Sequence, residues 1–236
     1  MSYGGVPKPR VEDEFAKRDG MGLDKNPKMK TEKEARTFYF KMISTLVVCV
    51  APLFGYFMYL AFRFVPGQAE KIDKKFLFIR EYDLGWVFVA VFMIFLTRAY
   101  LIINANGARA AARVDRPDQH IYRIMSPEKP FCDAPYVLMA NTGEAGRFNR
   151  AQRAVYNFDE SVPTFIVFQM MVAAIFGPLA LLIGLLHMYG RFTFANLYKQ
   201  DKDSRSSGFG ISVLAEYFAL GLTTVCMLKA FLPALP

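Results

Sequence analysis

Residues 161–190 read SVPTFIVFQMMVAAIFGPLALLIGLLHMYG and contain no Asp, Glu, Lys or Arg. A single straight helix of this length exceeds the roughly 20 residues that cross a hydrocarbon core of about 30 Å. The dipeptide Gly177-Pro178 lies near the middle of the run, and such a dipeptide marks a turn. The stretch therefore predicts two transmembrane helices, roughly 148–176 and 179–199, that meet in a tight hairpin.

Three further runs are long and apolar enough to cross a bilayer. Each has more than 20 residues and at most two charges: 42–62, 84–108 and 208–232. Because a charge in hydrocarbon is unfavourable by about 3 kcal/mol, we predict an all-α membrane protein with five spans. Pro52 and Gly55 should kink the first span. Arg98, in the second, should form a structural ion pair rather than contact a substrate.

Composition and charge exclude several other classes of protein. Apolar residues make up 53% of the chain, and the net charge is +8. The basic residues alternate with the spans instead of forming one basic and aromatic surface, which argues against nucleic-acid binding. Cys49, Cys132 and Cys226 have no Cys-x-x-Cys spacing, and His120 and His187 are far apart. We therefore expect neither a disulfide framework nor a metal site.

Residues 1–41 form a polar tail that lacks the apolar segment of a signal peptide. A segment of this composition is expected to be disordered unless a partner holds it. Five crossings place the tail, residues 105–153 and residues 191–207 on one side of the membrane, with 22 Lys and Arg residues, against 5 on the other side. This asymmetry predicts that the N-terminus faces the cytosol or the mitochondrial matrix.

The most informative polar segment is the start of the third predicted span, where residues 147–163 read RFNRAQRAVYNFDESVP. Arg150, Arg153, Asn157 and Glu160 are spaced i, i+3, i+7 and i+10, which places them on one helical face. Two cations, a carboxamide and a carboxylate suit a small zwitterionic ligand with an excess of carboxylate. Polar helix ends also contact headgroups, water or neighbouring helices, and the spacing alone fits either use.

Three motifs in this order resemble those of the MAPEG family (membrane-associated proteins in eicosanoid and glutathione metabolism). They are GARAAARVDRP at 107–117, RAVYNFDESVP at 153–163 and GRFTFANLY at 190–198. The resemblance implies a four-helix membrane domain over about residues 84–233. Residues 42–65 then form an additional N-terminal transmembrane helix, which follows the polar tail.

The resemblance also implies a site for glutathione as co-substrate, between adjacent subunits of a homotrimer and near the cytosolic face. Five residues match family positions that hold or line the tripeptide: Arg109, Arg153, Asn157, Glu160 and Tyr198. Arg205 is the candidate catalytic residue, because a nearby cation favours the reactive thiolate. Phe194 departs from the pattern, since several members carry a tyrosine there.

Two functions fit these residues. The first is a glutathione transferase or peroxidase acting on lipophilic substrates in the membrane of the endoplasmic reticulum or the mitochondrial inner membrane. The second is a non-catalytic accessory subunit of a large membrane complex, such as a mitochondrial respiratory complex, whose unrelated subunits hold the tail. The retained Arg, Asn and Glu set favours the first, whereas the added helix and Phe194 favour the second. Both imply contact with membrane lipids and none with nucleic acid.

Overall fold

The computed structural model describes residues 16–19, 23–114, 119–124 and 137–232. It is α-helical apart from one two-stranded antiparallel sheet, formed by β1 (Tyr122–Ile124) and β2 (Val137–Met139). Five helical segments of the described residues are long and apolar enough to cross a membrane: 32–63, 85–111, 143–175, 177–200 and 202–231. The prediction of an all-α membrane protein with five spans is confirmed.

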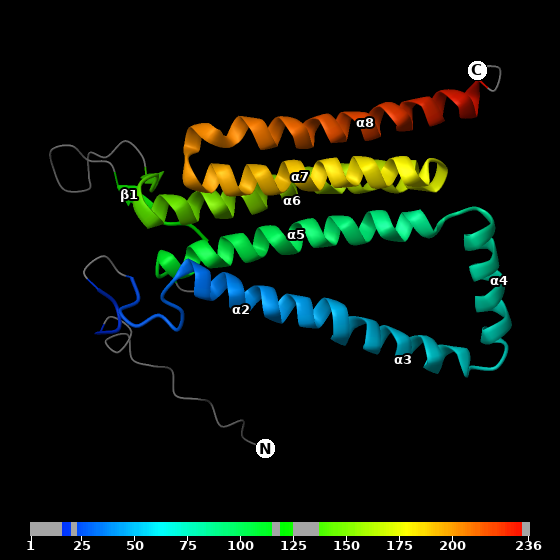
Figure 1. Cartoon of the computed structure of the whole chain (residues 1–236), viewed down its shortest axis with the longest axis horizontal. Helices are drawn as coiled ribbons and strands as arrows, with labels where there is room; N and C mark the ends of the chain where they lie inside the picture. Colours follow the sequence, from blue (N-terminus) through cyan, green and yellow to red (C-terminus); the bar gives the residue numbers. More distant parts are fainter. Residues whose placement is uncertain (1–15, 20–22, 115–118, 125–136, 233–236) are drawn as a thin grey trace.

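Four long helices form the main bundle. They are α5 (Gly85–Ala111), α6 (Gly143–Ile175), α7 (Gly177–Gln200) and α8 (Ser206–Phe231). Helix α7 contacts the other three, and α8 lies on the opposite side of the bundle from α5 (Figure 1). The 3₁₀ turn η2 (Lys202–Arg205) joins α7 to α8.

The hairpin between α6 and α7 confirms the predicted turn. Helix α6 ends at Ile175 and α7 begins at Gly177, with Pro178 in its first turn. Proline is tolerated there because the first backbone N–H groups of a helix have no partner within that helix. The hairpin packs onto the ring of Trp86, which leaves no room for a side chain at Gly177.

Small residues set the closest approach in the bundle, between α7 and α8. A Cβ added at Gly190 would lie 2.5 Å from the backbone nitrogen of Ser212, and one at Gly208 would collide with the backbone of Phe194. Helices in a membrane associate largely through such close packing, because lipid is as apolar as their side chains. The two glycines therefore determine how closely α8 packs against α7.

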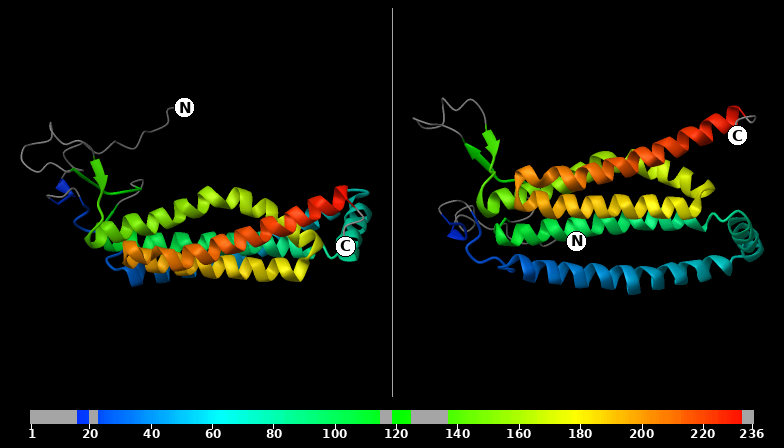
Figure 2. Two further views of the ribbon diagram at one scale, coloured as in Figure 1. Left: turned by 90° about the horizontal axis from the view of Figure 1, so that it is seen from above. Right: turned by 45° about the horizontal axis from the view of Figure 1, so that its top comes forward.

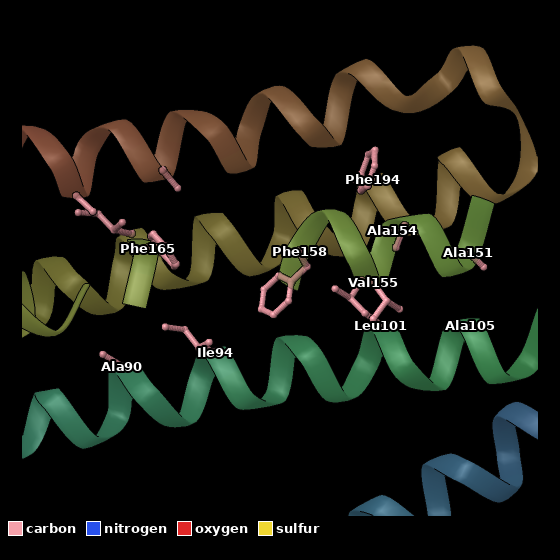
Figure 3. Close-up of a cluster of buried hydrophobic side chains, with 14 of the residues drawn as sticks. Ala90, Ile94, Leu101, Ala105, Ala151, Ala154, Val155, Phe158, Phe165 and Phe194 are labelled. Atoms are coloured by element: carbon pink, nitrogen blue, oxygen red, sulfur yellow. The ribbon is translucent and has the colours of Figure 1, made fainter. Parts of the chain in front are cut away.

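The apolar core lies between α5, α6 and α7. Figure 3 shows Leu101 and Ile94 of α5 facing Val155, Phe158 and the neighbouring alanines of α6. Phe158 and Phe165 are fully buried. Phe165 stacks on the imidazole of His187 with ring centroids 4.0 Å apart, and the Phe158 ring is tilted against it at 6.1 Å, so the core continues from α6 into α7.

The additional N-terminal helix begins ten residues before the predicted span, at Glu32 rather than at residue 42. One continuous helical segment runs through α2 (Glu32–Thr45), the π-helical turn η1 (Leu46–Val50) and α3 (Ala51–Arg63). The π turn ends two residues before Pro52, as expected where a proline removes a helical hydrogen bond. Helix α2 packs on α5 (Figure 1), whereas none of the α3 residues is buried.

The connector between the first two spans is itself a helix, α4 (Gln68–Glu81), which lies across the far end of α3 and α5 (Figure 2). Its carboxylate Asp73 accepts hydrogen bonds from the guanidinium of Arg63, which lowers the pKa of Asp73. This ion pair holds the end of α3 against α4. The start of α2, the end of α5 and the start of α6 all lie at the opposite end of the molecule (Figure 2).

Candidate functional site

The polar face at the start of α6 divides into two halves in the structure. Arg153 and Glu160 lie at the exposed edge and pair with each other, with Nη1 2.8 Å and Nη2 3.3 Å from the two carboxylate oxygens. Their side chains are 44% and 56% exposed. They lie seven residues apart, or about 10 Å along the helix. This open ion pair presents one cation and one anion to whatever approaches the edge.

The other half of the face turns toward α7. Arg150 donates to the carbonyls of Tyr198 (2.9 Å), Lys199 (3.1 Å) and Gln200 (3.3 Å) at the end of α7, and to Asn141 (2.8 Å). Those helix-terminal carbonyls have no partner within α7, and a cation there also interacts favourably with the helix dipole. Arg150 therefore serves as a cap that joins α6 to α7.

Asn157 belongs to a largely buried polar network between α6, α7 and α8. Its Oδ1 accepts from Arg191 of α7 at 2.7 Å. Arg191 is 1% exposed and also donates to Ser161 (2.6 Å) and to Glu216 of α8 (2.7 Å). His187 lies 3.3 Å from the Arg191 guanidinium. The network joins α6, α7 and α8. It occupies the amide oxygen of Asn157, a residue that the sequence predicted to bind the ligand.

The remaining candidates lie near the end of α7. The ring of Tyr198 is half-buried and stacks on Phe194, with centroids 5.3 Å apart and planes 14° apart. Arg205 is exposed where η2 meets α8 and has no hydrogen bond or ion pair with the described part of the chain. Asp201 instead accepts from Ser204 and from the backbone of Asp203, at 3.1 and 3.2 Å. Among the described residues, the Arg205 charge is thus left unpaired.

Arg109 is a residue of α5, and it lies apart from the Arg153–Glu160 pair of α6. Its guanidinium carbon is 4.8 Å from the centroid of the Phe148 ring. It lines a groove of about 440 Å³ between α5 and α6, together with Gln152, Tyr156 and other residues. Neither Arg153 nor Glu160 lines that groove. One chain therefore does not bring Arg109 together with the other predicted site residues.

The same groove contains the ion pair that the sequence predicted for Arg98. Its guanidinium donates to both carboxylate oxygens of Asp159, at 2.8 and 3.2 Å. This intramembrane arginine pairs with a side chain on α6, which confirms a structural ion pair.

His120 lies close to Arg153, outside the spans. Burial, and then the positive charge of Arg153, lower the pKa of His120. Its Nε2 atom is buried without a hydrogen-bond partner among the described residues, and its ring lies 5.4 Å from that of Tyr156. The imidazole is therefore neutral at pH 7 and adds no charge to the exposed edge of α6.

A polar cluster that the sequence did not reveal attaches the additional helix to the bundle. Glu32, at the start of α2, pairs with Lys199 of α7 and with Arg147 of α6 (2.7 Å). Lys199 is only 3% exposed, and its ammonium also donates to Asn104 of α5 at 2.7 Å. The cluster joins α2 to three helices of the bundle. Glu32 and Lys199 are 167 positions apart, so no local spacing could have predicted their pairing.

The described residues contain no group of three or more His, Cys, Asp or Glu side chains that could hold a metal ion. Cys49 is exposed in η1 and Cys226 is half-buried in α8. Cys132 lies outside the described residues.

A family model described as the MAPEG family matches residues 86–225, which is more than half of the chain. The matched segment begins in α5 and ends in α8, and it leaves out α2, α3 and α4. It contains all the predicted site residues. No curated protein matches the chain.

Proposed function

Because the chain belongs to the MAPEG family, we propose that it binds glutathione at the exposed edge of α6. There the tripeptide serves as co-substrate in a transferase or peroxidase reaction on lipophilic substrates that arrive through the bilayer. The observation that supports this proposal most is the exposed Arg153–Glu160 pair, together with the unpaired charge of Arg205 in the described part of the chain.

An exposed ion pair can be exchanged for contacts with a zwitterionic ligand. In this proposal a glutathione carboxylate takes the place of Glu160 beside Arg153, and the glutathione ammonium takes the place of Arg153 beside Glu160. The pair lost is an exposed one, worth about 0–1 kcal/mol. Two charge-assisted hydrogen bonds formed to the ligand outweigh it, since each contributes about 1.5–3 kcal/mol.

The arrangement of the arginines supports a site shared between subunits. Arg109 lines the α5–α6 groove, whereas Arg153 and Glu160 lie on another side of α6. A second copy of the chain could supply its Arg109 to the open edge of the first. We therefore propose a homotrimer of the kind implied by the family resemblance, with each site built from two neighbouring subunits.

Replacing Glu160 with Gln tests the binding proposal. The change removes the anion that takes the ligand ammonium, so the Kd for glutathione should rise about 10-fold or more, equivalent to at least 1.4 kcal/mol. Calorimetry on the detergent-solubilised protein measures this. The control is Glu144→Gln, which removes another exposed carboxylate paired with an arginine on α6 and should leave the Kd unchanged. Wild-type protein without affinity at millimolar glutathione contradicts the proposal.

A second candidate function is that of a non-catalytic subunit in a larger membrane complex. It is favoured by the Glu32–Lys199–Arg147 cluster, which attaches an additional helix outside the segment matched by the family model. It is also favoured by Phe194, which packs against Tyr198 and has no hydroxyl. The purified protein distinguishes the two functions. A homotrimer supports the enzyme, and a single copy among unrelated chains supports the accessory subunit.

For the orientation in the membrane, we propose that the tail and the segment before α6 share the cytosolic or matrix side, in the endoplasmic reticulum or the mitochondrial inner membrane. In a cysteine-free background, Lys30→Cys and Gln119→Cys should react with an impermeant thiol reagent from that side. Lys75→Cys, on α4, should react only from the other side. All three positions are exposed. Labelling of positions 30 and 119 from opposite sides would rule out five crossings.

A further inference from the structure

A second cavity lies at the same end of the molecule and is separate from the exposed edge of α6. Its volume is about 730 Å³, and it lies between residues 16–17 and 24–29 of the tail, the start of α2 and the end of α5. Five basic residues line it beside a single acidic one, Asp24: Lys17, Lys25, Lys28, Arg109 and Arg113. The cavity is therefore strongly basic.

Two of these cations are available to a ligand. The ammonium groups of Lys17 and Lys28 have no partner among the described residues, and both side chains are exposed. Arg113 is already paired with Asp19 at 2.8 Å, and Lys25 donates to the carbonyl of Ala16 at 3.1 Å. These internal contacts hold the wall of the cavity, while Lys17 and Lys28 supply charge without a counterion in the described part of the chain.

The height of the cavity along the helices matches the level of lipid headgroups. On α2 its lining reaches Tyr39, two residues before Lys41, which is the last charge before the uncharged run. On α5 the lining begins at Asn106, three residues before Arg109, which is the next charged residue along the helix. Tyrosine is enriched at this boundary between apolar and polar layers. A headgroup held here leaves its acyl chains in the bilayer.

We propose that this cavity binds the phosphodiester headgroup of an acidic phospholipid. Lys17 and Lys28 contact the phosphate oxygens, and residues 24–29 cover the headgroup from the aqueous side. Basic pockets between transmembrane helices recognise acidic headgroups in this way. The tail therefore gains a function in lipid recognition, which rests on Lys17 and Lys28 and on none of the residues proposed to bind glutathione.

Native mass spectrometry of the full-length protein tests the proposal. The protein is taken from micelles that contain phosphatidylglycerol and phosphatidylcholine in equal amounts. Wild type should retain phosphatidylglycerol preferentially. A basic residue near an acidic lipid is worth about a factor of five in affinity, so Lys17→Gln/Lys28→Gln should reduce the preference roughly 25-fold. The matched control is Lys71→Gln/Lys75→Gln on α4, where both lysines are also exposed, and it should keep the preference.

Three outcomes overturn the proposal: no preference in wild type, an equal loss in the control variant, or full displacement of the lipid by an equal concentration of inorganic phosphate. The last outcome would assign the cavity to a free anion. Circular dichroism of both variants shows whether any loss comes from unfolding, which is not expected because neither the Lys17 nor the Lys28 ammonium has a hydrogen bond or ion pair among the described residues.

Discussion

Replacing Arg191 with Met should lower the free energy of unfolding by about 3–5 kcal/mol. Arg191 is 1% exposed and donates to Asn157, Ser161 and Glu216, which belong to two other helices. Without the guanidinium, the carboxylate of Glu216, whose side chain is only 26% exposed, loses the arginine that balances its charge. Denaturant unfolding of the protein in mixed micelles, followed by circular dichroism, gives the free energy.

Two further variants test whether the buried charge is the cause. Arg191→Met/Glu216→Leu should recover most of the lost stability, because removal of both charges leaves none unpaired. Lys74→Met removes a lysine of α4 that is 72% exposed, lies outside the spans and pairs with Glu70, and it should lower the stability by no more than about 1 kcal/mol. An Arg191→Met loss as small as that of Lys74→Met contradicts this account of the network.

The spans could be predicted because charge in hydrocarbon is so unfavourable that a run of 20 or more uncharged, apolar residues is typical of a membrane-spanning helix. The turn at Gly177-Pro178 followed from the excess length of one run and from local turn chemistry. The start of α2 at Glu32 could not be predicted, because a helix can extend beyond the membrane through polar residues. Helix α4 was missed for a similar reason, since its charged residues resemble those of a loop.

The candidate site could be predicted only as a face of α6. Helical spacing places Arg150, Arg153, Asn157 and Glu160 within one broad stripe, but small differences in angle decide which of them meet α7. Arg150 and Asn157 contact α7, whereas Arg153 and Glu160 stay at the edge. Which residues contact α7 depends on how α6 and α7 pack. The spacing of residues within α6 does not determine that packing.

The ion pair between Arg191 and Glu216 could have been predicted from the sequence. Glu216 is the only acidic residue in the last span, and an isolated carboxylate in a membrane needs a cation nearby. Arg191 then lies at a matching depth on the preceding helix. The cluster of Glu32 and Lys199 offered no such signal, because both residues lie at the polar ends of their helices.

Replacing Arg205 with Ala should reduce the rate of glutathione conjugation on the order of 100-fold, the size expected when one group that stabilises developing negative charge is lost. The reactive species is the thiolate, and an ordinary thiol has a pKa near 8.5. The charge of Arg205 can lower that pKa, and each unit requires about 1.4 kcal/mol. Lys202→Ala removes a second exposed cation from the same turn and should leave the rate nearly unchanged.

The ultraviolet absorbance of thiolate in protein-bound glutathione, followed against pH, tests the central claim most directly. If the site binds and activates glutathione, the wild-type and Lys202→Ala proteins should show bound thiolate at pH 7, and Arg205→Ala should show it only near pH 8.5 or above. Glutathione that binds to the wild-type protein but stays protonated at pH 7 would contradict an enzymatic role and support the non-catalytic subunit.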